Sequence, residues 1–163
     1  MPSTPLNNWL QWLEQSPWSL AIRQSTWLYP ALEIVHITGI VLLVGSAFLF
    51  DIRILGFSTK IPVSSLERHL LTWSMRALIL VIPSGLLLFI TNAVALAHNP
   101  FFHTKLILIG VAAVNAWVFH TITLQSVSGW DISTPSPALA KLAAAVSIIT
   151  WIGVIACGRL LAY

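Results

Sequence analysis

Residues 28–50 read LYPALEIVHITGIVLLVGSAFLF, and within this stretch only Glu33 and His36 carry an acidic or basic side chain. A bilayer core about 30 Å thick is crossed by about 20 predominantly apolar residues in an α-helix. The stretch therefore predicts a membrane-spanning helix. It also sets the length and character with which the rest of the chain is compared.

Three further apolar runs have the same length and character: 73–97, 105–124 and 138–161. Turn-forming residues separate them, among them Gly56 and Pro62, the pair Asn99-Pro100, and Pro135 with Pro137. Such short connections place neighbouring helices antiparallel, and the runs do not match the alternating strands of about ten residues that build a β-barrel. The sequence predicts an all-α protein, a transmembrane four-helix bundle that occupies 27–163 and contacts the lipid bilayer.

The composition agrees with a membrane protein. Of the 163 residues, 57% are hydrophobic and only 8% are charged, whereas about a quarter of a soluble domain is charged. That excludes a soluble enzyme. The net charge is +3, but the basic residues are scattered singly beside the apolar runs, which excludes nucleic-acid binding. Cys157 is the single cysteine, so the chain has no disulfide framework.

Residues 1–26 predict an interfacial N-terminal helical segment. Trp9, Trp12 and Leu13 recur at helical spacing between polar residues, and Ser16-Pro17 is typical of a helix start. The segment lacks the basic start and small-residue cleavage site of a secretory signal, so we expect it to remain in the mature chain. Two arrangements stay open, namely a helix lying on the membrane surface and an ordered segment packed on the bundle.

An even number of spans places both termini on one side of the membrane. We call this side A, and the side that holds the first and third connections side B. Three basic residues fall on side A, namely Arg23, Lys105 and Arg159. Five fall on side B, namely Arg53, Lys60, Arg68, Arg76 and Lys141. This excess favours side B as the cytoplasmic side, with the termini facing outward.

Ionisable side chains inside the predicted spans are the candidate functional residues. Each costs a few kcal/mol to insert, so those that persist usually face the bundle interior and have a partner or a ligand. Helical spacing puts Glu33 and His36 on one face of the first span and Lys105 and His120 on one face of the third. By depth, the group near side A comprises Glu33, His36, His98, His103, Lys105 and Arg159. The group near side B comprises Asp51, Arg53, His69, Arg76, His120 and Asp131.

Histidines accompanied by basic residues in each leaflet are what b-type haem needs, since imidazoles bind the iron and cations pair with the propionates. The candidate metal ligands are His36 and His120. The other candidate cofactor-binding residues are Glu33, Arg76, Lys105 and Arg159. His36 and His120 belong to opposite leaflets and are not expected to share one iron. His36 also lies about 10 Å deeper than His98, so pairing those two would require helix tilt or the kink expected at Pro83.

The leading hypothesis is a redox-associated membrane module that binds haem b or acts beside a quinone or an electron-transfer partner, and is not an enzyme on its own. The alternative is a non-catalytic membrane subunit or scaffold. In that case Glu33 pairs with Arg159, Asp51 pairs with Arg53 or Arg76, and His36 bonds to Glu33 or a backbone carbonyl. Lys105 would extend to the headgroups, and Asn115 would bond across helices. A third hypothesis is a proton or small-solute conduit.

A set of short motifs resembles a family of small bacterial four-helix membrane proteins. They are Tyr29-Pro30-x-x-Glu33-x-x-His36-x-x-Gly39, Asp51-x-Arg53-x-Leu55-Gly56, Asn99-Pro100-x-Phe102-x-x-Lys105, Asn115, Phe119-His120 and Gly158-Arg159. That family is an uncharacterised one, a domain of unknown function, and the likeness covers nearly the whole chain.

The resemblance implies a four-helix fold, a multi-pass location in the bacterial inner membrane, and a preference for His36 and His120 over His69, His98 and His103. In that membrane, the outward-facing termini expected from the basic residues would be periplasmic. The resemblance implies no activity. With only these two histidines, each iron would have a single ligand, a ligand from a second copy in a homo-oligomer, or no place at all. The architecture is also distantly similar to cytochrome b561-type and CopD-type bundles.

Overall fold

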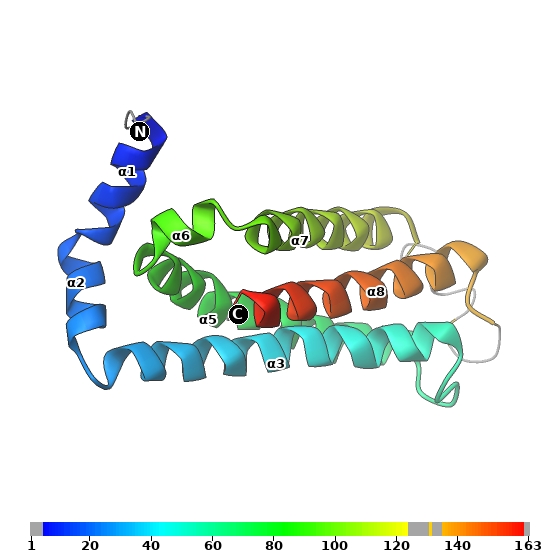
Figure 1. Cartoon of the computed structure of the whole chain (residues 1–163). Coiled ribbons are helices and arrows are strands. Elements are labelled where there is room, and N and C mark those ends of the chain that lie inside the picture. Colours follow the sequence, from blue (N-terminus) through cyan, green and yellow to red (C-terminus); the bar gives the residue numbers. More distant parts are fainter. Residues whose placement is uncertain (1–4, 124–130, 132–134, 162–163) are drawn as a thin grey trace.

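The computed structural model describes residues 5–123, 131 and 135–161, and this part of the chain is helical, without strands. In chain order the elements are α1 (Pro5–Glu14), α2 (Pro17–Gln24), α3 (Leu28–Leu55), α4 (Val63–Leu66), the π-helical turn η1 (Glu67–Leu71), α5 (Thr72–Ile90), α6 (Ala93–Ala97), α7 (Pro100–Val118), the π-helical turn η2 (Phe119–Thr123) and α8 (Ala138–Leu160) (Figure 1). The predicted all-α fold is confirmed.

Four helices are long and apolar enough to cross a membrane: Leu28–Leu55, Val63–Ile90, Pro100–Ile122 and Ala138–Leu160. The protein is therefore a multi-pass membrane protein. The second span begins at Val63, ten residues before the predicted start at 73, because η1 carries the helix without interruption from α4 into α5. The first span continues past residue 50 to Leu55, where Gly56 ends it in the left-handed conformation at φ 112°.

Helix α3 is central to the bundle. It packs against α5 and against α8, and α8 in turn packs against α7 (Figure 1). Among the described residues, α5 and α7 form no comparable packing contact. They meet at side A, where the rings of Phe89 and Phe102 stack with centroids 5.4 Å apart. The bundle is consequently open between α5 and α7 towards side B, and this opening positions the candidate site.

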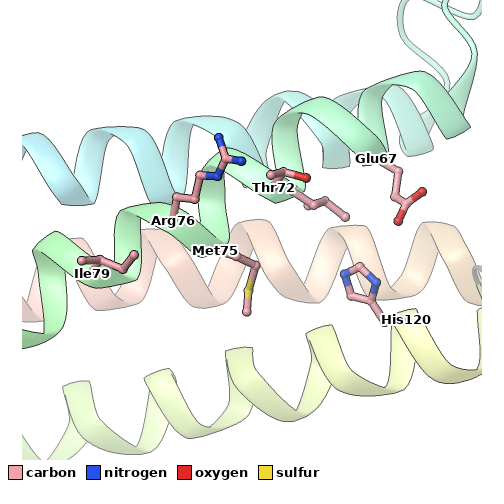
Figure 2. Close-up of a pocket in the computed structure, with 7 residues that line it drawn as sticks. Glu67, Thr72, Met75, Arg76, Ile79 and His120 are labelled. Carbon is pink, nitrogen blue, oxygen red and sulfur yellow. The ribbon is translucent and has the colours of Figure 1, made fainter.

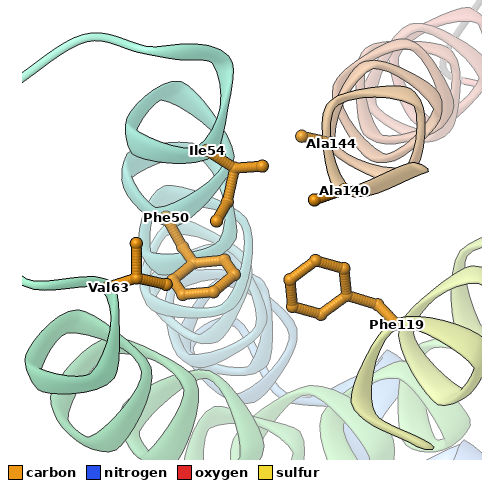
Figure 3. Packing of buried hydrophobic residues seen from close by; sticks show 6 residues of the cluster. All are labelled: Phe50, Ile54, Val63, Phe119, Ala140 and Ala144. Atoms are coloured by element: carbon orange, nitrogen blue, oxygen red, sulfur yellow. The ribbon is translucent and has the colours of Figure 1, made fainter. Parts of the chain in front are cut away.

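The hydrophobic core lies at the side B end of the bundle. It comprises Phe50, Ile54, Val63, Phe119, Ala140 and Ala144 (Figure 3). Phe50 of α3 and Phe119 of η2 meet edge to face, with ring centroids 5.6 Å apart. The two alanines of α8 leave room for these rings, which tie η2 to α3. Asn115 of α7 donates a hydrogen bond to the Ala143 carbonyl of α8 at 3.0 Å, which confirms the predicted cross-helix bond.

The N-terminal segment forms α1 and α2 and is attached to the side A end of the bundle. Ser16 caps α2 by accepting a hydrogen bond from the Ser19 amide at 3.3 Å, as the Ser16-Pro17 pair predicts. The carboxylate of Glu14 accepts a hydrogen bond from the Val94 amide at 2.9 Å, and the Ser19 hydroxyl donates to the Ile90 carbonyl at 3.1 Å. Trp9, Trp12 and Trp18 stay exposed. The segment thus packs on the bundle while it presents indole rings outward, at the level where headgroups lie.

Arg53 fastens the connections at side B. Its buried guanidinium donates hydrogen bonds to the carbonyls of Ile61 at 2.7 Å, Thr59 at 3.2 Å and Asp131 at 3.1 Å. The predicted ion pair between Asp51 and Arg53 is wrong, because these carbonyls occupy the guanidinium. Asp51 is buried near Ser147 of α8, and its Oδ2 atom has no hydrogen-bond partner within the described part of the chain.

Asp131 makes a second attachment at side B, and its hydrogen bonds make the stability of the fold depend on pH. Its carboxylate accepts hydrogen bonds from the Ser64 amide at 2.9 Å and the Ser64 hydroxyl at 2.8 Å. These bonds lower the pKa of Asp131 below its usual range, and the bond from the Ser64 amide has the largest effect. The ionised carboxylate therefore stabilises the fold above about pH 4, and this contribution is lost as the pH falls through the lowered pKa.

Asp131→Asn tests this expectation. We expect the melting temperature of the wild-type protein to fall between about pH 5 and pH 3 more steeply than that of the variant, because asparagine has no proton to gain there. Thermal unfolding in detergent across this range measures the difference. Parallel curves for the two proteins would show that the carboxylate contributes nothing to stability.

Candidate functional site

A groove of about 400 Å³ opens between the second and third spans at side B. Its lining residues are Glu67, Leu71, Thr72, Met75, Arg76, Ile79 and His120. Figure 2 shows His120 on one wall and the other labelled side chains on the facing wall, with α8 behind them. Leu71, Met75 and Ile79 make most of this surface apolar. Glu67 and His120 supply polar groups at its side B end, and Arg76 lies farther along the second span, near Ile79.

Two polar residues that line the groove lie in π-helical turns. Glu67 begins η1, and His120 lies in η2. A π-helical turn contains an extra residue, shifts the faces of the helix on either side of it, and occurs often at functional sites. Glu67, Leu71, Met75 and Ile79 follow one another at intervals of four residues, so they form one stripe along the second span. The stripe faces the third span, where His120 stands edge-on to Phe119 with ring centroids 6.2 Å apart.

Arg76 is held beside the groove by an aromatic ring. Its guanidinium carbon lies 5.5 Å from the centroid of the Trp73 ring, in a cation–π arrangement. The side chain is exposed, so its remaining donors are available to a ligand. In an apolar surrounding, a guanidinium that faces a groove favours an anionic or carbonyl-bearing group.

A second group of polar residues lies near side A, and we call it the side A cluster: His36, Ser84, Gly85, Lys105 and Gly158. The Nδ1 atom of His36 is 2.9 Å from the Ser84 hydroxyl oxygen. Ser84 uses its single proton to donate to the Leu80 carbonyl, so it accepts from His36. The Nδ1 atom of His36 therefore acts as the donor in this contact.

Gly85 allows the side A cluster to form, and Gly158 lies beside Lys105 at ordinary contact distance. A Cβ atom on Gly85 would lie 2.9 Å from Cε1 of His36, so a side chain there would displace the ring. A Cβ atom on Gly158 would lie 3.8 Å from the Nζ atom of Lys105. Lys105 is half-buried. Its ammonium turns towards α8 near the side A end of that helix, and the extension to the headgroups stays a prediction. Each of the four spans therefore contributes to this cluster.

The structure separates the predicted site residues into distinct places. Arg76 and His120 line the groove, and His36 and Lys105 belong to the side A cluster. Glu33 and Arg159 are exposed, on α3 and α8 respectively. Glu33 was expected to face inward with His36. It lies five residues into α3, about 7 Å from its side A end, where an outward carboxylate reaches the headgroup layer.

The described residues contain no group of three or more His, Cys, Asp or Glu side chains that could hold a metal ion. His36 and His120 lie in separate groups, as their predicted depths required. The scaffold interpretation placed His36 against Glu33 or a backbone carbonyl. The ring bonds to the Val81 backbone as well as to the Ser84 hydroxyl, so the backbone alternative is confirmed and the Glu33 alternative is not. Glu67 and Met75 are lining residues that the sequence analysis missed. Extending the second helix back to Val63 places both on one face, and that spacing is the signal that could have found them.

Comparison with known proteins gives one result for this chain. A family model described as "Family of unknown function (DUF6644)" matches residues 10–163. The chain belongs to this family. The match covers nearly the whole chain, so the N-terminal α2 and all four spans are parts of the DUF6644 domain. No curated protein and no solved structure matches the chain.

Proposed function

We propose that the protein is a redox-associated membrane module that binds the headgroup of a membrane quinone in the groove between the second and third spans. One observation supports this proposal above the others: His120 faces Glu67 across a groove that is otherwise mostly apolar, and Arg76 lines the same groove farther along the second span. Small-molecule sites are typically apolar clefts with a few convergent polar groups. A groove that opens between two spans is also accessible from the lipid, in which quinones dissolve.

The polar groups suit both redox states of such a headgroup. A quinone carbonyl accepts hydrogen bonds, and Arg76 and the N–H of His120 can donate them. A quinol hydroxyl donates a hydrogen bond, and the carboxylate of Glu67 or the imidazole nitrogen of His120 without a proton can accept it. The electrons would come from a membrane redox protein as partner, since the chain itself is not proposed to be an enzyme.

Haem b is the second candidate ligand, and Met75 is the observation that favours it. Histidine with methionine is a known pair of axial haem ligands, and Met75 and His120 line the same groove from facing walls. Arg76 would then pair with a propionate. Haem would supply one-electron transfer at this place. Met75 would thus be a second axial ligand to the iron beside His120, whereas no other histidine lines this groove among the described residues.

The location follows from the same proposal. A quinone or haem module of this family would reside in the bacterial inner membrane. The excess of Lys and Arg at side B supports an orientation in which that side is cytoplasmic and the termini are periplasmic. The groove would then open in the cytoplasmic leaflet.

His120→Ala tests the groove. We expect the purified protein to bind a short-chain benzoquinone with a Kd at least about tenfold lower than that of the variant, because a lost hydrogen bond in an apolar site costs about 1.4 kcal/mol or more. His98→Ala is the matched control, since His98 is exposed at side A and bonds only to its own helix, at the Val94 carbonyl.

Absorption spectra of the same preparations distinguish the two ligands. A Soret band that is lost in His120→Ala and altered in Met75→Leu would identify haem, whereas a colourless protein with His120-dependent quinone binding would identify the quinone. A folded, colourless protein that binds no quinone would refute both ligands and leave the scaffold. Proton flux into liposomes that depends on His120 but not on quinone would instead support the conduit.

A further inference from the structure

A second groove, of about 430 Å³, opens at side B between the ends of the first two spans and the connection that joins them. We call it the connection groove. Most of its lining is apolar, with Leu49 and Ile52 contributed by α3 and Leu66 and Leu70 by the second span. It shares no lining residue with the groove that holds His120. The second span therefore borders two separate grooves.

The connection groove lies at the level of the lipid headgroups. Each of the first two spans has 28 residues, which makes it about 42 Å long. That length matches a bilayer with its headgroup layers and exceeds the hydrocarbon core by about 12 Å. The lining extends from the connection to Leu49 and Leu70, which lie about 10 Å from the side B ends of their spans. The groove thus runs from the headgroup layer into the edge of the hydrocarbon core.

The connection groove carries positive charge. Arg53 forms part of its lining, and the hydrogen bonds of the guanidinium go to neutral backbone carbonyls. Lys60 is exposed in the connection that contributes to the groove. The carboxylate of Asp131 interacts electrostatically with Arg53, but it is bound to Ser64. None of the five acidic residues of the chain lines the groove. Such a basic pocket beside membrane spans attracts an anionic headgroup.

Hydroxyl groups accompany this charge. Ser58 and Ser65 both line the groove and are exposed, and a serine hydroxyl can donate a hydrogen bond to a phosphate oxygen. His69 lies one turn after Ser65, and its Nδ1 atom donates to the Ser65 carbonyl at 2.9 Å, because a carbonyl oxygen only accepts. This bond uses the Ser65 carbonyl and not the Ser65 hydroxyl. The groove therefore combines hydroxyl donors, positive charge and an apolar lining.

We propose that the connection groove binds an anionic phospholipid of the side B leaflet. The phosphate accepts hydrogen bonds from Ser58 and Ser65, in the positive field of Arg53 and Lys60. The first carbons of the acyl chains pack on the apolar lining, which includes Leu49. A zwitterionic lipid such as phosphatidylcholine brings a second, positive charge that the basic residues repel, so the groove prefers a lipid with net negative charge.

Thermal unfolding of the full chain in a non-ionic sugar detergent tests this site. Phosphatidylglycerol is titrated into the protein, and phosphatidylcholine with the same acyl chains is the comparison. We expect phosphatidylglycerol to raise the Tm by about 5 °C when its effective concentration is about a hundredfold above its Kd. An equal rise with phosphatidylcholine, or no rise with either lipid, would overturn the proposal.

Ser65→Trp places a large ring in the groove, so we expect it to abolish the rise. Thr121→Trp is the matched control and should keep it, because Thr121 is exposed in η2 at the same side of the membrane and does not line the groove. A full rise in Ser65→Trp would show that the lipid binds elsewhere, and the proposal would then be wrong.

Lys60→Gln changes the charge without filling the groove, and it decides the question if Ser65→Trp does not fold. We expect it to raise the Kd for phosphatidylglycerol about fivefold, the contribution of one basic residue near an anionic headgroup. Lys141→Gln is the control on α8, outside the groove lining, and should change the Kd by less than about twofold because of screening. Equal effects of the two variants would mean that only the general charge of side B attracts the lipid, which contradicts a site in the groove.

Discussion

Replacing Arg53 with alanine is expected to lower the free energy of unfolding by about 4 kcal/mol. The guanidinium is only 3% exposed and donates to three backbone carbonyls, two in the first connection and one at Asp131. Its removal leaves these carbonyls without their donor and opens a cavity at the side B end of the core. The α3–α4 turn and residue 131 would lose their common anchor. Reversible unfolding in mixed micelles measures the loss.

Arg68→Ala is the control for this prediction. Arg68 lies in η1 on the same side of the membrane and is exposed, so its removal should change the free energy of unfolding by less than about 0.5 kcal/mol. Arg53→Lys should fall between the two, since one ammonium cannot reproduce the fork of donors that a guanidinium offers. Equal stability of Arg53→Ala and Arg68→Ala would mean that the connections hold their places without Arg53.

The sequence predicts the fold well because the bilayer imposes a length on every span. Runs such as 28–50 are too apolar to be anything else. It predicts the start of the second span poorly, since Glu67, Arg68 and His69 look like a polar connection. In the structure they form η1, a helical turn whose charged side chains remain at the membrane boundary. The change from apolar to polar residues shows where a helix leaves the lipid. It does not show where the helix itself ends, because the helix can continue into the polar region.

The candidate site is less predictable for a related reason. Face assignments assume a constant 3.6 residues per turn, and the two π-helical turns break that assumption at Glu67–Leu71 and Phe119–Thr123. The sequence predicts His120 and Arg76 as site residues but not Glu67 and Met75, which line the same groove from the second span. It separated His36 from His120 by depth, which needs only the rise per residue. It placed Glu33 inward, which needs the rotation of α3 relative to its neighbours, and only packing fixes that rotation.

The packing of α3 on α5 predicts a second large effect, at Gly39. A Cβ atom on this residue would lie 2.7 Å from Cγ2 of Val81, 3.1 Å from Cβ of Leu80 and 3.3 Å from the Val81 backbone nitrogen. A rotamer change at Val81 relieves only the first contact, so Gly39→Ala must move α5 away from α3. We expect it to lower the free energy of unfolding by about 2 kcal/mol, although alanine favours a helix more than glycine does.

Gly45→Ala isolates the steric part of this effect, because Gly45 lies on the same helix and a Cβ there would meet no atom within 4 Å. Alanine should raise the free energy of unfolding by up to about 1 kcal/mol at that position. The displacement in Gly39→Ala also reaches the side A cluster. His36 is one turn from Gly39, and its partner Ser84 is one turn from Leu80, so the 2.9 Å bond between them should lengthen. The imidazole resonances of His36 would then shift in Gly39→Ala and stay unchanged in Gly45→Ala. Similar stability and similar resonances for both variants would show that α3 and α5 tolerate a wider separation than their close contact at Gly39 indicates.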